Sequence, residues 1–166
     1  MSQQLKTSVG IWALGPMITR FVPWGYQPEH GVESTAEKVR RAVAGLGDLM
    51  DGYEFHYPAE LSEVNLEDVR DELGGHDVYA IATGLHLDPR FGKGGLTSPD
   101  ADTRTEALRL TLAAADFAGS IGAKLICWPG IEGYNYPFQT AYAESWARLI
   151  DGIGQAAQRC AEHGTT

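Results

Sequence analysis

Strand and helix signals alternate four times along this chain, and this alternation constrains the fold more than any other feature. Short apolar runs, typical of buried strands, are each followed by a segment with apolar residues at helical spacing. The predicted strands cover residues 9–14, 52–56, 78–83 and 124–128, and helical segments follow all four. No hairpin signal joins two strands. The sequence therefore predicts an α/β fold of about four βα units, with parallel strands and crossover helices.

Boundary signals support these elements. Ser34 and Glu37 form a capping-box pattern before an apolar face that ends at Gly47. Asn65 is predicted to cap a helix that ends at Gly74, and a third helix is expected over about 102–118. The fourth helix carries its apolar residues at Trp146, Leu149, Ile150, Ile153, Ala157 and Cys160.

The loops differ in length on the two sides of the predicted sheet. Loops that follow strands are long and rich in Trp, His, Tyr and Asp, whereas the returns at 47–51, 74–77 and 119–123 are short. In α/β barrels and open α/β sheets, chemistry is located at the carboxyl ends of the strands. We therefore expect the functional residues in the long loops.

Two architectures accommodate the alternation. A dinucleotide-binding sheet needs a Gly-rich turn after its first strand, and Gly15-Pro16-Met17 does not provide one. A closed (β/α)₈ barrel needs eight units and about 200 or more residues, whereas this chain has 166. Four units would leave unpaired strand edges and half-covered apolar faces. We therefore expect residues 1–166 to form half a barrel, completed by its own continuation, a completing chain or a homo-oligomer.

Composition excludes several classes of function. A net charge of −9 disfavours binding to nucleic acid, and 43% apolar residues suit a globular protein. No apolar run is long enough to span a membrane, and residues 1–6 lack the apolar segment of a secretory signal. Cys127 and Cys160 cannot make a disulfide framework, which favours the reducing cytoplasm.

Four segments in order resemble the N-terminal half of xylose isomerase and its sugar-isomerase relatives. They are Val9–Gly15, Phe55–Leu61, the third strand and loop over 82–100, and Trp128–Gly133. The resemblance implies a TIM barrel that acts on a sugar or sugar derivative. It also implies that His56 assists ring opening and that Trp12 and Trp128 wall the sugar. The divalent metal of the family (Mg, Mn or Co) would be held by later strands, so its ligands are expected outside this chain and none within it.

The sequence departs from the family pattern at several positions. Tyr57-Pro58-Ala59-Glu60 replaces an acidic run, which leaves Glu60 as the candidate carboxylate for orienting His56. His86 stands where xylose isomerase has an aromatic residue, and Pro129 and Ile131 replace a Gly and an Arg. These differences favour a divergent relative.

The candidate site residues each have a structural alternative. Catalytic candidates are His56 and Glu60, and substrate-binding candidates are Trp12, Trp128, His86, Phe91, Glu132 and Tyr134. A strand Trp also commonly fills a barrel interior, His86 suits a solvated loop, and Glu132 suits a loop cap. Trp24, Tyr26 and His30 suit a lid. His76 is expected to be structural, and His163 and the Arg40-Arg41 pair are expected to be solvated.

The leading hypothesis is a metal-dependent sugar isomerase or epimerase of the aldose–ketose type. A lyase that cleaves a C-glycoside is the first alternative, with His56 as general acid and base. A non-catalytic half-barrel that binds a partner through its open edges is the second. Relatives that repair nucleic acid form a third, which the acidic charge disfavours.

Overall fold

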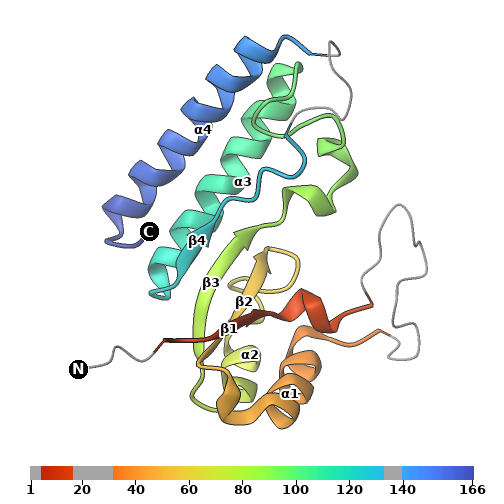
Figure 1. Cartoon of the computed structure of the whole chain (residues 1–166), viewed down its shortest axis with the longest axis vertical. Coiled ribbons are helices and arrows are strands. Elements are labelled where there is room, and N and C mark those ends of the chain that lie inside the picture. The colour runs from red at the N-terminus through yellow and green to blue at the C-terminus, as the bar shows by residue number, and fades with distance from the viewer. Residues whose placement is uncertain (1–4, 17–31, 133–139) are drawn as a thin grey trace. The chain divides into compact units, whose positions relative to one another are not determined.

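The computed structural model describes residues 5–16, 32–132 and 140–166, and its strands and helices alternate as expected (Figure 1). The strands are β1 (Ser8–Gly10), β2 (Gly52–Tyr57), β3 (Asp77–Thr83) and β4 (Lys124–Ile126). The helices are α1 (Thr35–Leu46), α2 (Leu66–Leu73), α3 (Ala101–Ser120) and α4 (Tyr142–Glu162). Short 3₁₀ turns are η1 (Ile11–Leu14), η3 (Gly47–Leu49), η4 (Leu85–Leu87) and η5 (Pro89–Phe91). The strands are hydrogen-bonded in the order β1-β2-β3-β4, which confirms a parallel half-barrel.

The chain divides into two compact units, whose boundary falls within β3. In the first unit, residues 1–80, β1 pairs in parallel with β2, so that Ser8 is opposite Gly52. Helices α1 and α2 lie side by side in this unit (Figure 1). Its buried core contains Ile11, Val39, Ala42, Tyr53, Phe55, Leu61, Val69 and Leu73.

The capping box predicted at the start of α1 is confirmed. The Ser34 hydroxyl accepts a hydrogen bond from the Glu37 backbone N–H at 3.2 Å, and Glu37 accepts one from the Ser34 backbone N–H at 2.8 Å. Gly47, with φ of 49°, ends the helix in the left-handed region that glycine adopts without strain. Local sequence therefore determines both ends of α1.

The first and fourth strands are shorter than predicted. β1 ends at Gly10, and the chain then turns into η1, so Trp12 is not a strand residue. Arg41 of α1 donates to the Leu14 carbonyl at 2.7 Å and thereby secures the end of η1. This contact also shows that Arg41 is part of a partly buried network, rather than solvated as predicted. β4 ends at Ile126, so Trp128 lies two residues beyond the strand.

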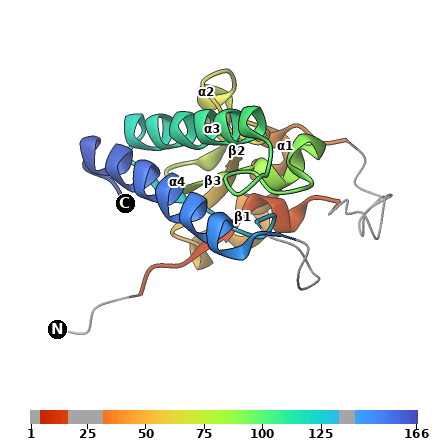
Figure 2. The ribbon, with the colours of Figure 1, turned by 90° about the horizontal axis from the view of Figure 1, so that it is seen from above.

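In the second unit, residues 81–166, α3 and α4 run side by side (Figures 1 and 2). Small buried residues on α3, including Ala114, Ala115 and Ala118, leave room for neighbouring elements. The Asp116 carboxylate of α3 accepts from Arg159 and contacts the His163 ring, both at 2.8 Å. The prediction that His163 is merely solvated is therefore wrong.

Helix α4 exposes most of the apolar residues that the sequence assigned to it. Trp146 is 60% exposed, Ile150 is 54% exposed and Ile153 is 37% exposed, whereas Cys160 is buried as expected. The buried side of the helix is instead formed by small residues, including Gly152 and Ala156. We call Trp146, Ile150 and Ile153 the α4 stripe. None of the helices in the described part of the chain has the length and hydropathy of a bilayer span.

Candidate functional site

His56 lies near the end of β2, where the chain turns back on itself. Pro58 cannot donate a backbone hydrogen bond, so strand pairing stops there. The backbone N–H groups of Glu60 and Leu61 then donate to the His56 carbonyl at 2.8 and 3.1 Å. This turn brings the Glu60 side chain back to His56, which lies four residues earlier.

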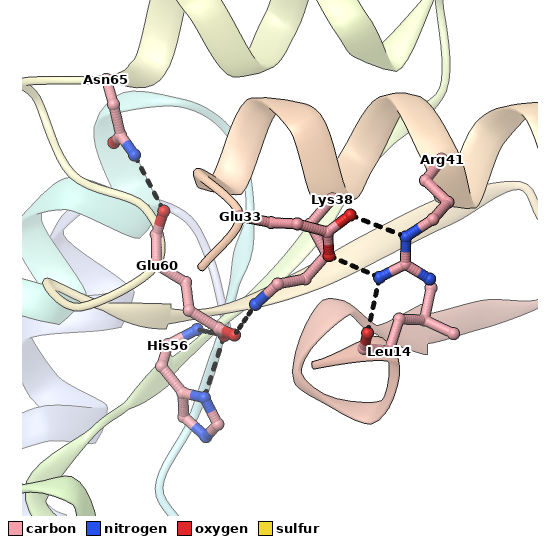
Figure 3. A network of polar contacts seen from close by, with 7 residues as sticks. All are labelled: Leu14, Glu33, Lys38, Arg41, His56, Glu60 and Asn65. Carbon is pink, nitrogen blue, oxygen red and sulfur yellow. Dashed lines mark hydrogen bonds and ion pairs between the residues drawn. The ribbon is translucent and has the colours of Figure 1, made fainter. Parts of the chain in front are cut away.

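The Glu60 carboxylate makes two contacts with His56 (Figure 3). Its Oε2 atom lies 3.0 Å from the ring Nδ1 and 3.0 Å from the backbone nitrogen. An ionised carboxylate can only accept hydrogen bonds, so Nδ1 must carry the ring proton. In the neutral ring, Nε2 then holds the lone pair and is able to accept a proton.

Two further residues fix Glu60. Lys38 of α1 places its ammonium nitrogen 3.5 Å from Oε1, and both side chains are nearly nine-tenths buried. Asn65 donates from Nδ2 to the Glu60 backbone carbonyl at 2.9 Å and accepts from the Ser62 backbone N–H at 2.9 Å. Asn65 does stand at the N-terminal boundary of α2, but its side chain holds this loop instead of capping the helix.

The surroundings of Glu60 favour its ionised form. Burial by itself raises the pKa of the carboxyl, but hydrogen bonds from the His56 ring and backbone and the charges of His56 and Lys38 outweigh it. The pKa of Glu60 therefore lies below its ordinary value of 4.5. A carboxylate that stays ionised keeps the His56 ring in one tautomer.

Trp12 covers one side of this histidine. The two ring centroids are 4.3 Å apart, and the ring planes are inclined by 41°. The indole lies so close to Gly10 that a Cβ atom there would overlap it. The Trp12 ring can therefore occupy this place only when residue 10 is a glycine.

In the second unit, Trp128 and Glu132 line a small cleft that is partly open to solvent. Trp128 is 54% exposed and meets the His86 ring edge to face, with 4.5 Å between centroids. The other lining residues are Thr83, Leu85, Leu96, Thr111, Cys127, Pro129, Leu149 and Ile153. Burial raises the pKa of the Cys127 thiol, so this group is protonated at neutral pH and contributes a small apolar surface.

Glu132 uses its carboxylate to hold a loop. It accepts hydrogen bonds from the backbone N–H groups of Gly95, Leu96 and Thr97 at 3.1, 2.8 and 2.9 Å, and from the Thr97 hydroxyl at 2.6 Å. The structure thus places Glu132 in the loop-capping arrangement that the sequence left open. With four donors already bound, this carboxylate supports the cleft wall.

Phe91 lies in the hydrophobic core of the second unit. Its ring is 1% exposed and belongs to a cluster with Leu85, Leu96 and Ala107. Such a ring has no face left for a ligand, so we do not include Phe91 in the proposed site. Tyr134 and the suggested lid residues Trp24, Tyr26 and His30 lie outside the described residues.

Lys38 is the residue that sequence reasoning missed. Its partner Glu60 follows 22 positions later, so no local pattern connects them. One signal was present, because Lys38 precedes the fully buried Val39 and lies four residues before the buried Ala42. A lysine on the inner face of an amphipathic helix indicates a buried acidic partner.

Comparison with known proteins shows which family this chain resembles. The family described as a xylose isomerase-like TIM barrel matches residues 40–166. The xylose isomerase of Thermus thermophilus is 40% identical over 60 residues, which are 36% of this chain and 16% of that protein. The xylose isomerase of Thermus caldophilus is 35% identical over 79 residues, 46% of this chain and 20% of that protein.

Solved structures show the same fold. A D-allulose 3-epimerase from Methylomonas sp. aligns with a TM-score of 0.63 and 17% identity, covering 98% of this chain and 50% of that one. A structure of this epimerase in complex with D-allulose aligns with the same TM-score and 16% identity, covering 98% of this chain and 49% of that one. The chain thus spans about half the length of these structures and a fifth or less of the xylose isomerases in matched residues.

Proposed function

The chain belongs to the xylose isomerase-like TIM barrel family, and from this membership we propose that it carries the ring-opening residues of a sugar isomerase or epimerase. The observation that carries the proposal is the contact of His56 Nδ1 with the Glu60 carboxylate at 3.0 Å. This contact makes Nε2 of the neutral ring a proton acceptor at the carboxyl end of a barrel strand. Active sites of this fold lie on that face.

Opening of a cyclic sugar needs a proton to move between two oxygens. The anomeric hydroxyl loses its proton, the bond between C1 and the ring oxygen breaks, and a C1 carbonyl forms. The ring oxygen leaves with the electron pair of the broken bond and takes up a proton. His56 Nε2 receives the first proton and returns it to the ring oxygen, so the histidine is unchanged at the end.

Trp12 and Trp128 serve this proposal as apolar surfaces. An indole face packs against the C–H groups of a sugar and keeps water from the reacting oxygens. Trp12 lies next to the proposed base, and Trp128 is half exposed in its own unit. His86, which contacts Trp128, is proposed to orient that ring and bind a hydroxyl.

The family resemblance implies a divalent metal, and we assign no step to it. Within residues 5–16, 32–132 and 140–166, no group of three His, Cys, Asp or Glu side chains is arranged to hold one. His56, Glu60 and Glu132 are engaged in the contacts described above. We propose that this chain supplies sugar positioning and ring opening.

The relatives support a monosaccharide substrate. Two of them are xylose isomerases, and the aligned epimerase structure holds D-allulose. We propose an aldose or ketose of this size, interconverted between its aldose and ketose forms or epimerised.

We also propose that another polypeptide surface covers the α4 stripe, either a second copy of this chain or a completing chain. Three large apolar side chains on one helix are 37–60% exposed, and large contiguous apolar surface marks an interaction site.

The test compares a substrate whose ring must open with a substrate that cannot form a ring. His56→Asn in the purified native assembly is expected to lower kcat/KM at least a hundredfold for a pyranose substrate. It should leave the rate nearly unchanged for glyceraldehyde, which is too short to close a ring. Equal losses on both substrates would exclude a ring-opening role, and turnover of a C-glycoside in place of a sugar would favour the lyase alternative.

A further inference from the structure

We propose that Lys38 is a positioning residue, which holds the Glu60 carboxylate against His56 and thereby fixes the proton on Nδ1 of the imidazole. Figure 3 shows Lys38 reaching the carboxylate from α1, while His56 approaches it from β2. The two carboxylate oxygens are divided between these partners. Oε2 contacts His56, and Oε1 lies 3.5 Å from the lysine ammonium.

Because this ion pair is largely buried, its loss should affect the protein strongly. The side chain of Lys38 is 13% exposed and that of Glu60 is 12% exposed, so neither charge is well solvated. Removing one partner of such a pair leaves an uncompensated charge, which is far more costly than losing a surface pair. The lysine is therefore an integral part of the carboxylate's environment.

The start of α1 and the segment that carries Gly15 together position the Lys38 side chain. Ser34 begins α1 with its capping box, and the Lys38 backbone N–H then donates to the Ser34 carbonyl at 3.1 Å. Gly15 leaves space for the ammonium, since a Cβ atom at that position would lie 3.3 Å from Nζ. The segment carrying Gly15 is tied to α1 by the bond from Arg41 to Leu14.

Within the described part of the chain, the charged groups that contact the carboxylate come from two elements. His56 and Lys38 contact it directly from β2 and α1. The next pair, Glu33 with Arg41, is joined by hydrogen bonds of 2.9 and 2.7 Å and is thereby internally compensated. Among these described groups, Lys38 is the cation that remains when the imidazole is neutral. It therefore adds to the hydrogen bonds from His56 in keeping Glu60 an acceptor for Nδ1–H.

This inference rests on the proposed function for its catalytic consequence, but not for its structural one. Loss of Lys38 should release the carboxylate, let the His56 ring sample both tautomers and reduce the fraction with a basic Nε2. The value of kcat should then fall, while KM changes little.

The experiment is NMR of the purified protein with ¹⁵N-labelled histidine and ¹³C-labelled glutamate. In the native protein, His56 should show a single Nδ1–H tautomer at neutral pH. In Lys38→Met, which keeps the apolar stem, the Glu60 carboxyl signal should titrate at higher pH and the tautomers should mix. Lys38→Arg should restore the native behaviour at least in part. Arg40→Met is the matched control on the exposed face of the same helix, where Arg40 pairs with Glu72.

An unchanged Glu60 titration together with a single tautomer in Lys38→Met would overturn the inference. If that variant fails to fold by circular dichroism, Lys38→Gln takes its place under the same criterion. The two proposals fail separately. A changed tautomer with no selective loss in His56→Asn would remove the ring-opening role alone, whereas an unchanged tautomer with that loss would remove the role of Lys38 alone.

Discussion

The indole of Trp12 lies against the imidazole of His56, with 4.3 Å between the ring centroids. The same pairing recurs in the second unit, where Trp128 contacts His86 at 4.5 Å. Each indole also covers a glycine two residues away in sequence, Gly10 for Trp12 and Gly130 for Trp128. Each unit therefore positions a tryptophan just beyond a strand by the same device: a glycine that leaves room for the ring.

The position of Trp12 is expected to depend on Gly10. Gly10→Ala would place a methyl group inside the indole, so the ring must move away from His56 at a cost of about 1–3 kcal/mol of unfolding free energy. Urea unfolding measures the cost, and the NMR signals of the His56 ring report the displacement. Gly45→Ala is the control, because its Cβ meets nothing within 4 Å in the last turn of α1. It should stabilise the protein by about 0.5–1 kcal/mol.

Glu132 is expected to stabilise the cleft wall. Glu132→Ala removes the carboxylate that accepts four hydrogen bonds from residues 95–97 and should lower the unfolding free energy by about 2–3 kcal/mol. Hydrogen exchange should accelerate at the backbone N–H groups of those residues. Glu144→Ala, which removes an exposed ion pair with Arg148, should cost less than about 0.5 kcal/mol. Equal effects of the two variants would contradict the assigned role.

The stability contribution of Glu60 is expected to depend on pH. Its pKa in the folded protein lies below the ordinary value of 4.5, so the unfolded chain binds this proton more readily. The stabilisation by ionised Glu60 is therefore complete above that ordinary value and is lost as the pH falls through the lower folded one. The difference in unfolding free energy between the native protein and Glu60→Gln should be constant near neutrality and shrink in acid. A difference that is independent of pH between 7 and about 3 would contradict this.

Removing the α4 stripe is expected to alter assembly. Trp146→Gln with Ile150→Gln replaces two exposed apolar side chains and should shift the molar mass measured by light scattering towards the single chain. Gln155→Ala is the control, because Gln155 is exposed and hydrogen-bonds Asp151 on the same helix. It follows Ile153 by two residues and therefore lies on a different face of the helix from the stripe. An oligomer that persists unchanged in the double variant would place the interface elsewhere.

Local patterns predicted most of the fold. The capping box of Ser34 and Glu37, the stop at Gly47, and the bounds of β2 and β3 followed from sequence to within a residue. Errors occurred where a contact distant in sequence decides the conformation. Residues 11–14 have a strand-like apolar pattern, yet they form η1, whose Leu14 carbonyl accepts from Arg41.

The site was predicted in part for the same reason. The family resemblance suggested Glu60 as the carboxylate that orients His56. The two residues are four positions apart, so a single turn brings them together. Phe91 and Glu132 were selected by their place in a motif, which does not reveal burial or hydrogen bonding. The structure places the first in the core and gives the second four donors.

The sequence by itself determined the order of the elements, the parallel half-barrel and the turn that joins His56 to Glu60. These features depend on periodicity and on residues within a few positions of one another. Only the tertiary structure brought Lys38 to Glu60, set Trp12 against His56 and left the α4 stripe exposed. These features depend on contacts between residues far apart in sequence. The packing of helices and strands decides which of those residues meet, and no local pattern encodes it.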